Sequence, residues 1–151
     1  MTRNVYALAA ILITLPLAAQ EHKLDRKDLP AAVEKTVQTQ SQGATIKGFA
    51  TERENGKKVY EVEMTSNGHS KDIQIATDGT LNEIEEEVAF DSLPTAVQTA
   101  LTAKANGAKI TKVESLTKHD KLVAYEAATL KGTHKGEIQV GPDGNKLPHA
   151  E

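Results

Sequence analysis

The chain repeats one short string: "DLPAAV" at residues 28–33 returns as "SLPTAV" at residues 92–97. Leu29 of the first string recurs as Leu93, 64 positions later. Self-similarity at such a period is the sequence signature of a repeated structural unit. We therefore take the chain of 151 residues as two tandem copies of one unit.

The two copies match well beyond this string, in the same order and with an offset that grows from 64 to 65. The matching segments are "GATIKGF" (43–49) with "GAKITKV" (107–113), "VYEVE" (59–63) with "AYEAA" (124–128), and "KDIQIATDG" (71–79) with "GEIQVGPDG" (136–144). The second copy has therefore gained one residue. We place it near residues 120–122, in a predicted turn, because surface turns tolerate insertions.

Each copy begins with a predicted helix. Pro30 and Pro94 suit the first helical turn, where a missing N–H costs nothing. Apolar residues at helical spacing define the buried side of the helices: Leu29, Val33 and Val37, then Leu93, Val97 and Leu101. We expect Asp28 and Ser92 to cap the helices, which should end near the next glycine of each copy.

Antiparallel strands follow each helix. Ile46 and Phe49 are three residues apart, as are Ile110 and Val113, so strict alternation cannot place either pair on one face. We predict a β-bulge at residues 47–48 and another at 111–112. The first copy continues into a strand over residues 81–88, whereas the second has room only for a stub. Predicted turns are Asn55-Gly56, Asn67-Gly68, Asp78-Gly79 and Asp143-Gly144.

The predicted fold class is α+β. A unit of about 65 residues buries only about 60% of its unfolded surface and is marginal alone. We therefore expect two tandem helix-plus-antiparallel-strands repeats that form one sheet with the helices on one face. Repeat one spans about 24–90 and repeat two about 91–147. Two separate domains are the alternative, although "DSLP" at 91–94 leaves almost no linker.

Residues 1–20 have the pattern of a signal peptide. Arg3 precedes the apolar run "VYALAAILITL" at 5–15, and small residues follow Pro16. The run is too short for a membrane helix, which needs about 20 apolar residues. We expect cleavage near Ala19 or Gln20, which leaves a periplasmic or secreted domain at 21–151 without a stable membrane anchor.

Composition excludes several classes of function. The chain has no Cys, so it has neither a disulfide framework nor a thiol nucleophile. Aromatic residues make up 3% of the chain and the formal net charge is −3. Base stacking and phosphate neutralisation are therefore poorly served, and we expect no nucleic-acid partner.

The repeated motifs resemble a known family. An exported chain carries "LPxAV", "GAxI", "YE" and a strand ending in "DG", all twice, over roughly residues 24–146. This order is similar to that of the PepSY-like family, whose fold resembles that of the beta-lactamase inhibitory protein. The resemblance implies an exported helix-on-sheet module. It also implies inhibition of a secreted enzyme, with the target bound on the open face of the sheet.

Catalytic motifs are missing. None of the five serines lies in a GxSxG or SxxK pattern, and the chain has no HExxH and no glycine-rich phosphate loop. His69 and His134 occupy equivalent repeat positions, but a metal site normally needs three or four converging ligands. We therefore predict no catalytic, cofactor-binding or metal-binding residues, no cofactor, and a protein that is not an enzyme.

Acidic side chains are predicted to share the outer face of the sheet, the densest run being "NEIEEEV" at 82–88. The residues are Glu61, Glu63, Asp72, Glu83, Glu85, Glu87, Glu126 and Glu137. One interpretation is a solvated face that prevents edge-to-edge aggregation. The other is a surface for a basic partner or for cations. We predict an exported binding module that inhibits an extracytoplasmic hydrolase or protease; the alternative is a periplasmic sensor of small ligands or cations.

Overall fold

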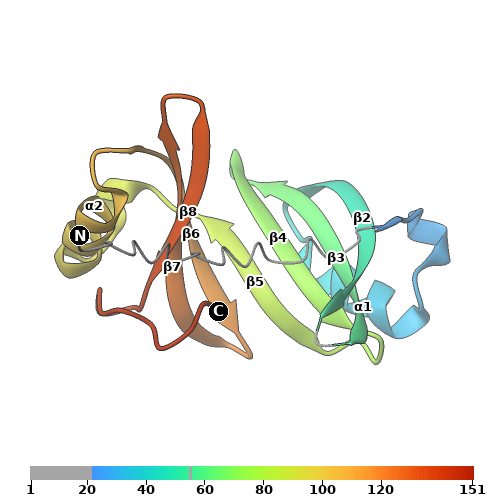
Figure 1. Cartoon of the computed structure of the whole chain (residues 1–151). Coiled ribbons are helices and arrows are strands. Elements are labelled where there is room, and N and C mark those ends of the chain that lie inside the picture. The colour runs from blue at the N-terminus through green and yellow to red at the C-terminus, as the bar shows by residue number, and fades with distance from the viewer. Residues whose placement is uncertain (1–21, 55) are drawn as a thin grey trace, which may run out of the picture.

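The computed structural model describes residues 22–54 and 56–151, which form one antiparallel sheet and two α-helices (Figure 1). The strands follow chain order across the sheet, from β1 at one edge to β8 at the other. They are β1 (His22–Lys23), β2 (Ala44–Glu54), β3 (Lys57–Ser66), β4 (His69–Ala76), β5 (Leu81–Glu87), β6 (Lys109–Lys118), β7 (Lys121–Lys131) and β8 (His134–Val140). The helices are α1 (Ala31–Gln40) and α2 (Thr95–Ala105), each preceded by a 3-10 turn, η1 (Arg26–Asp28) or η2 (Phe90–Ser92).

The duplicated sequence folds as a duplicated structure. The first half consists of α1 with β2, β3 and β4, and the second half consists of α2 with β6, β7 and β8. β5 joins the halves because it pairs with β4 on one side and with β6 on the other. Figure 1 shows α1 beside the first half of the sheet and α2 beside the second. The predicted α+β class with tandem repeats is confirmed.

Each helix buries its apolar side in a core of its own. Residues of the first core include Val33, Val37, Val62, Met64, Ile73 and Ile75; those of the second include Val97, Leu101, Val113, Ala127 and Val140. Ile84 of β5 packs on the first core and faces Thr117 of β6 across the strands. Thr117 and Val113 are four residues apart in β6 and therefore point to the same side of the sheet. Val113 packs in the second core. Both helices therefore cover the same face of the sheet, as predicted.

The helices begin directly after the repeated Leu-Pro pair, and the prediction that Asp28 and Ser92 cap them is wrong. Both residues end 3-10 turns, and the prolines take the N-cap position without a side-chain hydrogen bond. A residue before proline avoids the helical region, so the leucine of each pair stays extended and holds Asp28 and Ser92 away from the helix. Ser92 Oγ instead donates a hydrogen bond to Ala89 O at 2.7 Å.

Both predicted β-bulges are present. The register shifts between Ile46 and Gly48 on β2 and between Ile110 and Lys112 on β6. One extra residue on each strand thus lets apolar side chains three positions apart reach the same face. A spacing of three between apolar residues indicates a β-bulge here because both strands pair antiparallel with a neighbouring strand.

The prediction that the residue gained by the second repeat lies in the turn near 120–122 is wrong. Lys118 pairs with Lys121 across the β6–β7 turn, and Glu54 pairs with Lys57 at the equivalent positions of the first repeat, so the offset is still 64 there. The register instead shifts between Leu116 and Thr117 of β6, whose partners Ala124 and Leu122 bracket one extra residue, Val123. A bulge in β7 therefore absorbs the insertion and leaves the turn unchanged.

The two Asp-Gly turns dock onto the helices. Gly79 and Gly144 have φ of +88° and +80°, which favours glycine. A Cβ on Gly79 would lie 2.6 Å from Ala32 O of α1, and a Cβ on Gly144 would lie 2.6 Å from Ala96 O of α2. Each turn therefore requires glycine for two reasons: the positive φ and the close approach of the turn to the helix backbone.

Two predictions concern parts of the chain outside the described residues. The signal peptide at residues 1–20 is one, and Asn55 of the first predicted turn is the other. Within the described part, neither helix is long and apolar enough to cross a membrane.

Candidate binding surface

The open face is the side of the sheet away from both helices. Strand register aligns most of the predicted acidic residues on it in three rows that run across neighbouring strands. The rows are Glu63–Asp72–Glu85, Glu61–Gln74–Glu83 and Glu87–Glu114–Glu126. The eighth residue, Glu137, lies on the edge strand β8 and faces Ala128 of β7. The structure thus places all eight predicted residues on the open face.

Glu114 is the one acidic residue of these rows that the sequence analysis missed. It is 8% exposed and lies between Glu87 and Glu126. Its counterpart in the first repeat is Ala50, so the repeat gave no sign of it. The available signal was the alternation of polar Lys112 and Glu114 with apolar Val113, which places Lys112 and Glu114 on the same side of β6.

Three carboxylates meet where the two halves join, and we call Asp72, Glu85 and Glu114 the acidic cluster. They come from β4, β5 and β6, and one oxygen of each lies within 4.8 Å of the others. This is the one group of metal-ligand type found in the described residues, and it includes neither His69 nor His134. Chemically, such a group can share protons or hold a hard cation through oxygen.

Burial and mutual repulsion make the open face a poor place for so many negative charges. Burial, followed by the charge of Glu83, raises the pKa of Glu85 to about 8. Burial and then the charge of Glu114 raise the pKa of Asp72. Burial and a hydrogen bond with Glu137 raise the pKa of Glu126 to about 7, although the Gln139 amide, which donates to Glu126, opposes this. The surface would therefore be stabilised by added positive charge or by protons.

The protein's own cations neutralise this charge only in part. Lys112 Nζ lies 2.8 Å from Glu114 Oε1, and Lys118 Nζ lies 3.4 Å from Glu83 Oε2. Ser70 N–H and Oγ donate to Glu87, and these bonds lower the pKa of that carboxyl. Asp72 and Glu85 have no ion pair within 4.0 Å in the described part of the chain.

The open face is hollowed in its first half. A cavity of about 230 Å³ lies among acidic and amide side chains of β2 to β5. Its lining includes Glu52, Glu61, Asp72, Gln74, Glu83 and Glu85. Gln74 Nε2 donates to Glu52 Oε1 at 3.0 Å, whereas Gln74 Oε1 is buried without a hydrogen-bond partner among the described residues. The hollow therefore offers more hydrogen-bond acceptors than donors, and Gln74 Oε1 is an acceptor without a donor among the described residues.

Residues 146–151 cover part of the second half. Glu151 N–H donates to Gln139 Oε1 at 2.9 Å, and Lys118 Nζ lies 3.7 Å from Glu151 Oε2. Between this segment and the sheet lies a second hollow of about 330 Å³, lined in part by Glu126, Glu137 and Leu147. Within the described part of the chain, the uncovered part of the open face is therefore the first half together with the acidic cluster.

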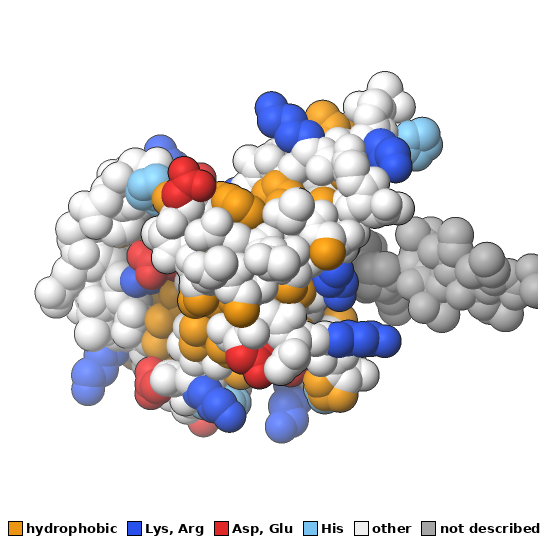
Figure 2. Space-filling model, turned by 90° about the vertical axis from the view of Figure 1, so that its left-hand side faces the viewer, with side chains coloured by type: hydrophobic (Ala, Val, Ile, Leu, Met, Phe, Trp, Pro, Cys, Tyr) orange, Lys and Arg blue, Asp and Glu red, His pale blue; other side chains and the backbone are white. Residues whose placement is uncertain are grey.

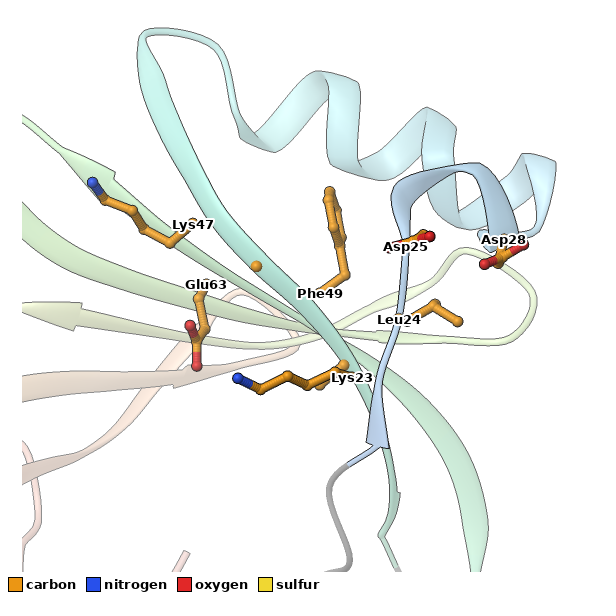
Figure 3. A pocket seen from close by; sticks show the side chains of 9 residues that line it. Lys23, Leu24, Asp25, Asp28, Lys47, Phe49 and Glu63 are labelled. Carbon is orange, nitrogen blue, oxygen red and sulfur yellow. The ribbon is translucent and has the colours of Figure 1, made fainter.

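A larger cavity of about 680 Å³ lies at the opposite edge of the sheet, beside β1 and β2 (Figure 3). Figure 3 shows Lys23 and Glu63 over the strands, and Phe49 directed toward α1. The lining contains no Ser, Thr, Cys or His, and its titratable side chains are those of Lys23, Asp25, Asp28, Lys47 and Glu63.

Comparisons with known proteins agree with this architecture. The sequence profile described as "Putative beta-lactamase-inhibitor-like, PepSY-like" matches the chain twice, over residues 17–82 and 58–139. A BLIP-like protein from Bacteroides fragilis is 20% identical, with 78% of this chain and 82% of that chain covered and a TM-score of 0.59. A "putative periplasmic" protein from Bacteroides eggerthii is 18% identical, with coverages of 77% and 84% and a TM-score of 0.63.

A further similar structure is a DUF2874 family protein from Bacteroides uniformis. It is 16% identical, with 80% of this chain and 86% of that chain covered and a TM-score of 0.62. At these identities the structures establish the shared fold alone. A comparison with curated proteins finds no match. The two profile matches span most of the sequence, and the chain belongs to the beta-lactamase-inhibitor-like, PepSY-like family.

Proposed function

We propose that this protein is an exported, non-enzymatic binding module that acts in the periplasm or outside the cell. It presents the uncovered part of its open face to another exported protein and inhibits an extracytoplasmic hydrolase or protease. Membership of the family and the fold support a binding role.

The observation that carries the proposal is the acid-lined hollow of the first half. Its carboxylates lie half-buried, and the buried Gln74 Oε1 there has no donor among the described residues. A Lys or Arg side chain of a partner would bring the missing donors and charge, and Arg can donate five N–H bonds. We therefore expect a partner with a basic side chain at the centre of its contact surface.

The test begins by identifying the partner through capture from periplasm or culture supernatant of the native cell, with mass spectrometry. Binding kinetics of that partner are then measured against the wild type and against the triple variant Glu83→Lys, Glu85→Lys, Glu87→Lys. The variant should reduce the association rate by about tenfold or more and weaken its salt dependence, because charge complementarity steers encounter.

A matched control carries the same change in charge away from the open face. Asp28→Lys, Glu86→Lys and Asp91→Lys reverse three exposed acids on other surfaces. If both triple variants slow association equally, net charge rather than the open face governs binding. If neither does, or if no specific partner is captured, the proposed surface is wrong. Inhibition is assayed as the loss of the partner's hydrolytic activity on addition of the module.

A second candidate function is a sensor of cations or small ligands, which the acidic cluster favours. Three carboxylate oxygens within 4.8 Å of one another suit a divalent cation. Binding to the folded state would raise the melting temperature with calcium or zinc concentration. That rise should vanish in the Asp72→Asn, Glu114→Gln variant, and a melting temperature indifferent to both metals contradicts this candidate.

A further inference from the structure

The outer edge of β8 is vacant at a position that the fold fills elsewhere. β4 and β8 are equivalent strands of the two repeats, and each pairs on one side with the preceding strand. The other side of β4 pairs with β5, whereas no strand among the described residues pairs with the other side of β8. The first repeat thus shows that this edge can accept an antiparallel strand.

Residues of β8 are more exposed than their counterparts in β4, as expected for a strand without a neighbour on its outer side. Ile73 of β4 is 1% exposed, whereas its counterpart Ile138 of β8 is only partly buried. Asp72 is partly buried, and its counterpart Glu137 is exposed. Figure 2 shows the tip of the β7–β8 hairpin standing out from the body, with Lys and His side chains on it. An exposed edge of this kind presents free N–H and C=O groups to another strand.

Residues 146–151 do not occupy this edge, although the repeat would place them there as the counterpart of β5. They cross the open face instead, where Glu151 bonds to Gln139. Pro148 lacks the N–H that a paired strand needs. The edge is therefore available to a strand from another molecule.

The charges of β8 select one way in which two copies of the strand can pair. The two-residue β7–β8 turn and the alternation of the ladder leave the N–H and C=O groups of Lys135 and Glu137 directed outward. Opposing either residue with itself places like charges together, which is unfavourable. Opposing Lys135 with Glu137 of the other copy forms two pairs of opposite charge around Gly136. Neither residue has an ion pair within the described part of its own chain.

We propose that β8 is the contact of a symmetric homodimer, in which Lys135 of each copy faces Glu137 of the other across a two-fold axis at Gly136. The pairing is closed, because each copy uses the same edge. The axis of an antiparallel strand pair stands perpendicular to the sheet, so both open faces lie on one side. Dimerisation would therefore join two acidic faces into one surface. This proposal does not depend on the proposed binding function.

A charge exchange tests the register in protein exported from cells that express the full chain. Sedimentation velocity should show a dimer for the wild type. Glu137→Lys opposes lysine with lysine twice and should weaken dimerisation by about tenfold or more. Adding Lys135→Glu restores opposite charges and should restore the dimer. A wild type that stays monomeric, a dimer that survives Glu137→Lys, or a double variant that stays monomeric would each overturn the proposal.

A cysteine cross-link tests the axis directly, because the wild-type chain has no Cys. Residues opposed in a non-hydrogen-bonded antiparallel pair have Cα atoms about 4.5 Å apart, within the range of a disulfide of about 4.4–6.8 Å. Gly136→Cys should therefore give a disulfide-linked dimer under mild oxidation. Its Cβ would lie 3.0 Å from Thr129 Oγ1, so its melting temperature is checked first.

The matched control is Lys71→Cys, at the equivalent position of β4, whose edge β5 already covers. Lys71→Cys should remain monomeric under the same oxidation. Equal cross-linking of both variants would indicate random collision, and no cross-linking of a folded Gly136→Cys variant would refute the axis. If a foreign strand or residues 146–151 occupy the edge in solution, the wild type remains monomeric and the proposal fails.

Discussion

Glu85 is the residue on which the conflict between burial and charge is greatest. It lies on β5 in the acidic cluster, and burial raises its pKa from 4.5 to about 8. On raising pH, the unfolded chain therefore releases this proton before the folded protein does. The free energy of unfolding should fall between pH 4.5 and pH 8 as a result.

We predict that Glu85→Gln reduces this pH dependence, to which the raised pKa values of Asp72 and Glu126 also contribute. One pKa unit corresponds to about 1.4 kcal/mol, and partial solvent screening reduces the expected gain at pH 8 to about 1–2 kcal/mol. Urea denaturation at pH 5 and pH 8 measures the difference. Glu86→Gln is the control, because Glu86 is exposed and points to the opposite side of β5. Equal pH dependence in the wild type and Glu85→Gln would contradict the prediction.

Gly79 is a residue that cannot be replaced freely, because its backbone conformation and its contact with α1 both favour glycine. We predict that Gly79→Ala destabilises the protein more than Gly68→Ala does. Both glycines have left-handed φ, +88° and +87°, so either substitution carries a backbone cost of about 1–2 kcal/mol. Only Gly79 also abuts α1, where forcing a Cβ against Ala32 O should add about 1–3 kcal/mol. Urea denaturation compares them, and equal losses would show that the contact with α1 is not limiting.

At the scale of the element, α2 packs on the sheet through two fully buried side chains, Val97 and Leu101. Leu101 is fully buried against the second core. We predict that Leu101→Ala costs about 2–5 kcal/mol, because the lost contacts leave a cavity. Thr99→Ala, on the exposed side of α2, should stay within about 0.5 kcal/mol of the wild type.

Hydrogen exchange shows where that loss is felt. Amides of α2 and β8 should exchange faster in Leu101→Ala, whereas those of α1 should keep their protection, because α1 packs in the other core. Uniform loss of protection across both helices would show that the two cores unfold as one.

The starts of these helices show what local sequence can and cannot predict. The Leu-Pro pair correctly marked where α1 and α2 begin, because proline restricts the residue before it. The same restriction keeps Ser92 out of the capping position. The preference of Ser and Asp for N-cap positions does not by itself predict this effect of the following proline. The bulges were predictable for a related reason: apolar residues three apart need one extra residue in a paired strand.

At the scale of the whole molecule, the repeat made the order of the strands and the membership of the open face predictable. Alternation placed Glu85 and its neighbours on one side without any knowledge of tertiary structure. Two features depended on distant contacts and escaped prediction. Glu114 gains its importance from facing Glu87 and Glu126, and residues 146–151 take their path from a bond to Gln139.

β5 also has a consequence for how such a chain can evolve. Because the strand is the last of one half and the first neighbour of the next, tandem gene duplication adds a complete new half without creating an unmatched strand between the two. A premature stop after β4 would instead leave β4 without the strand that pairs with its outer side. The fold can therefore be lengthened by copying, whereas a division after β4 exposes a strand edge that is paired in the whole protein.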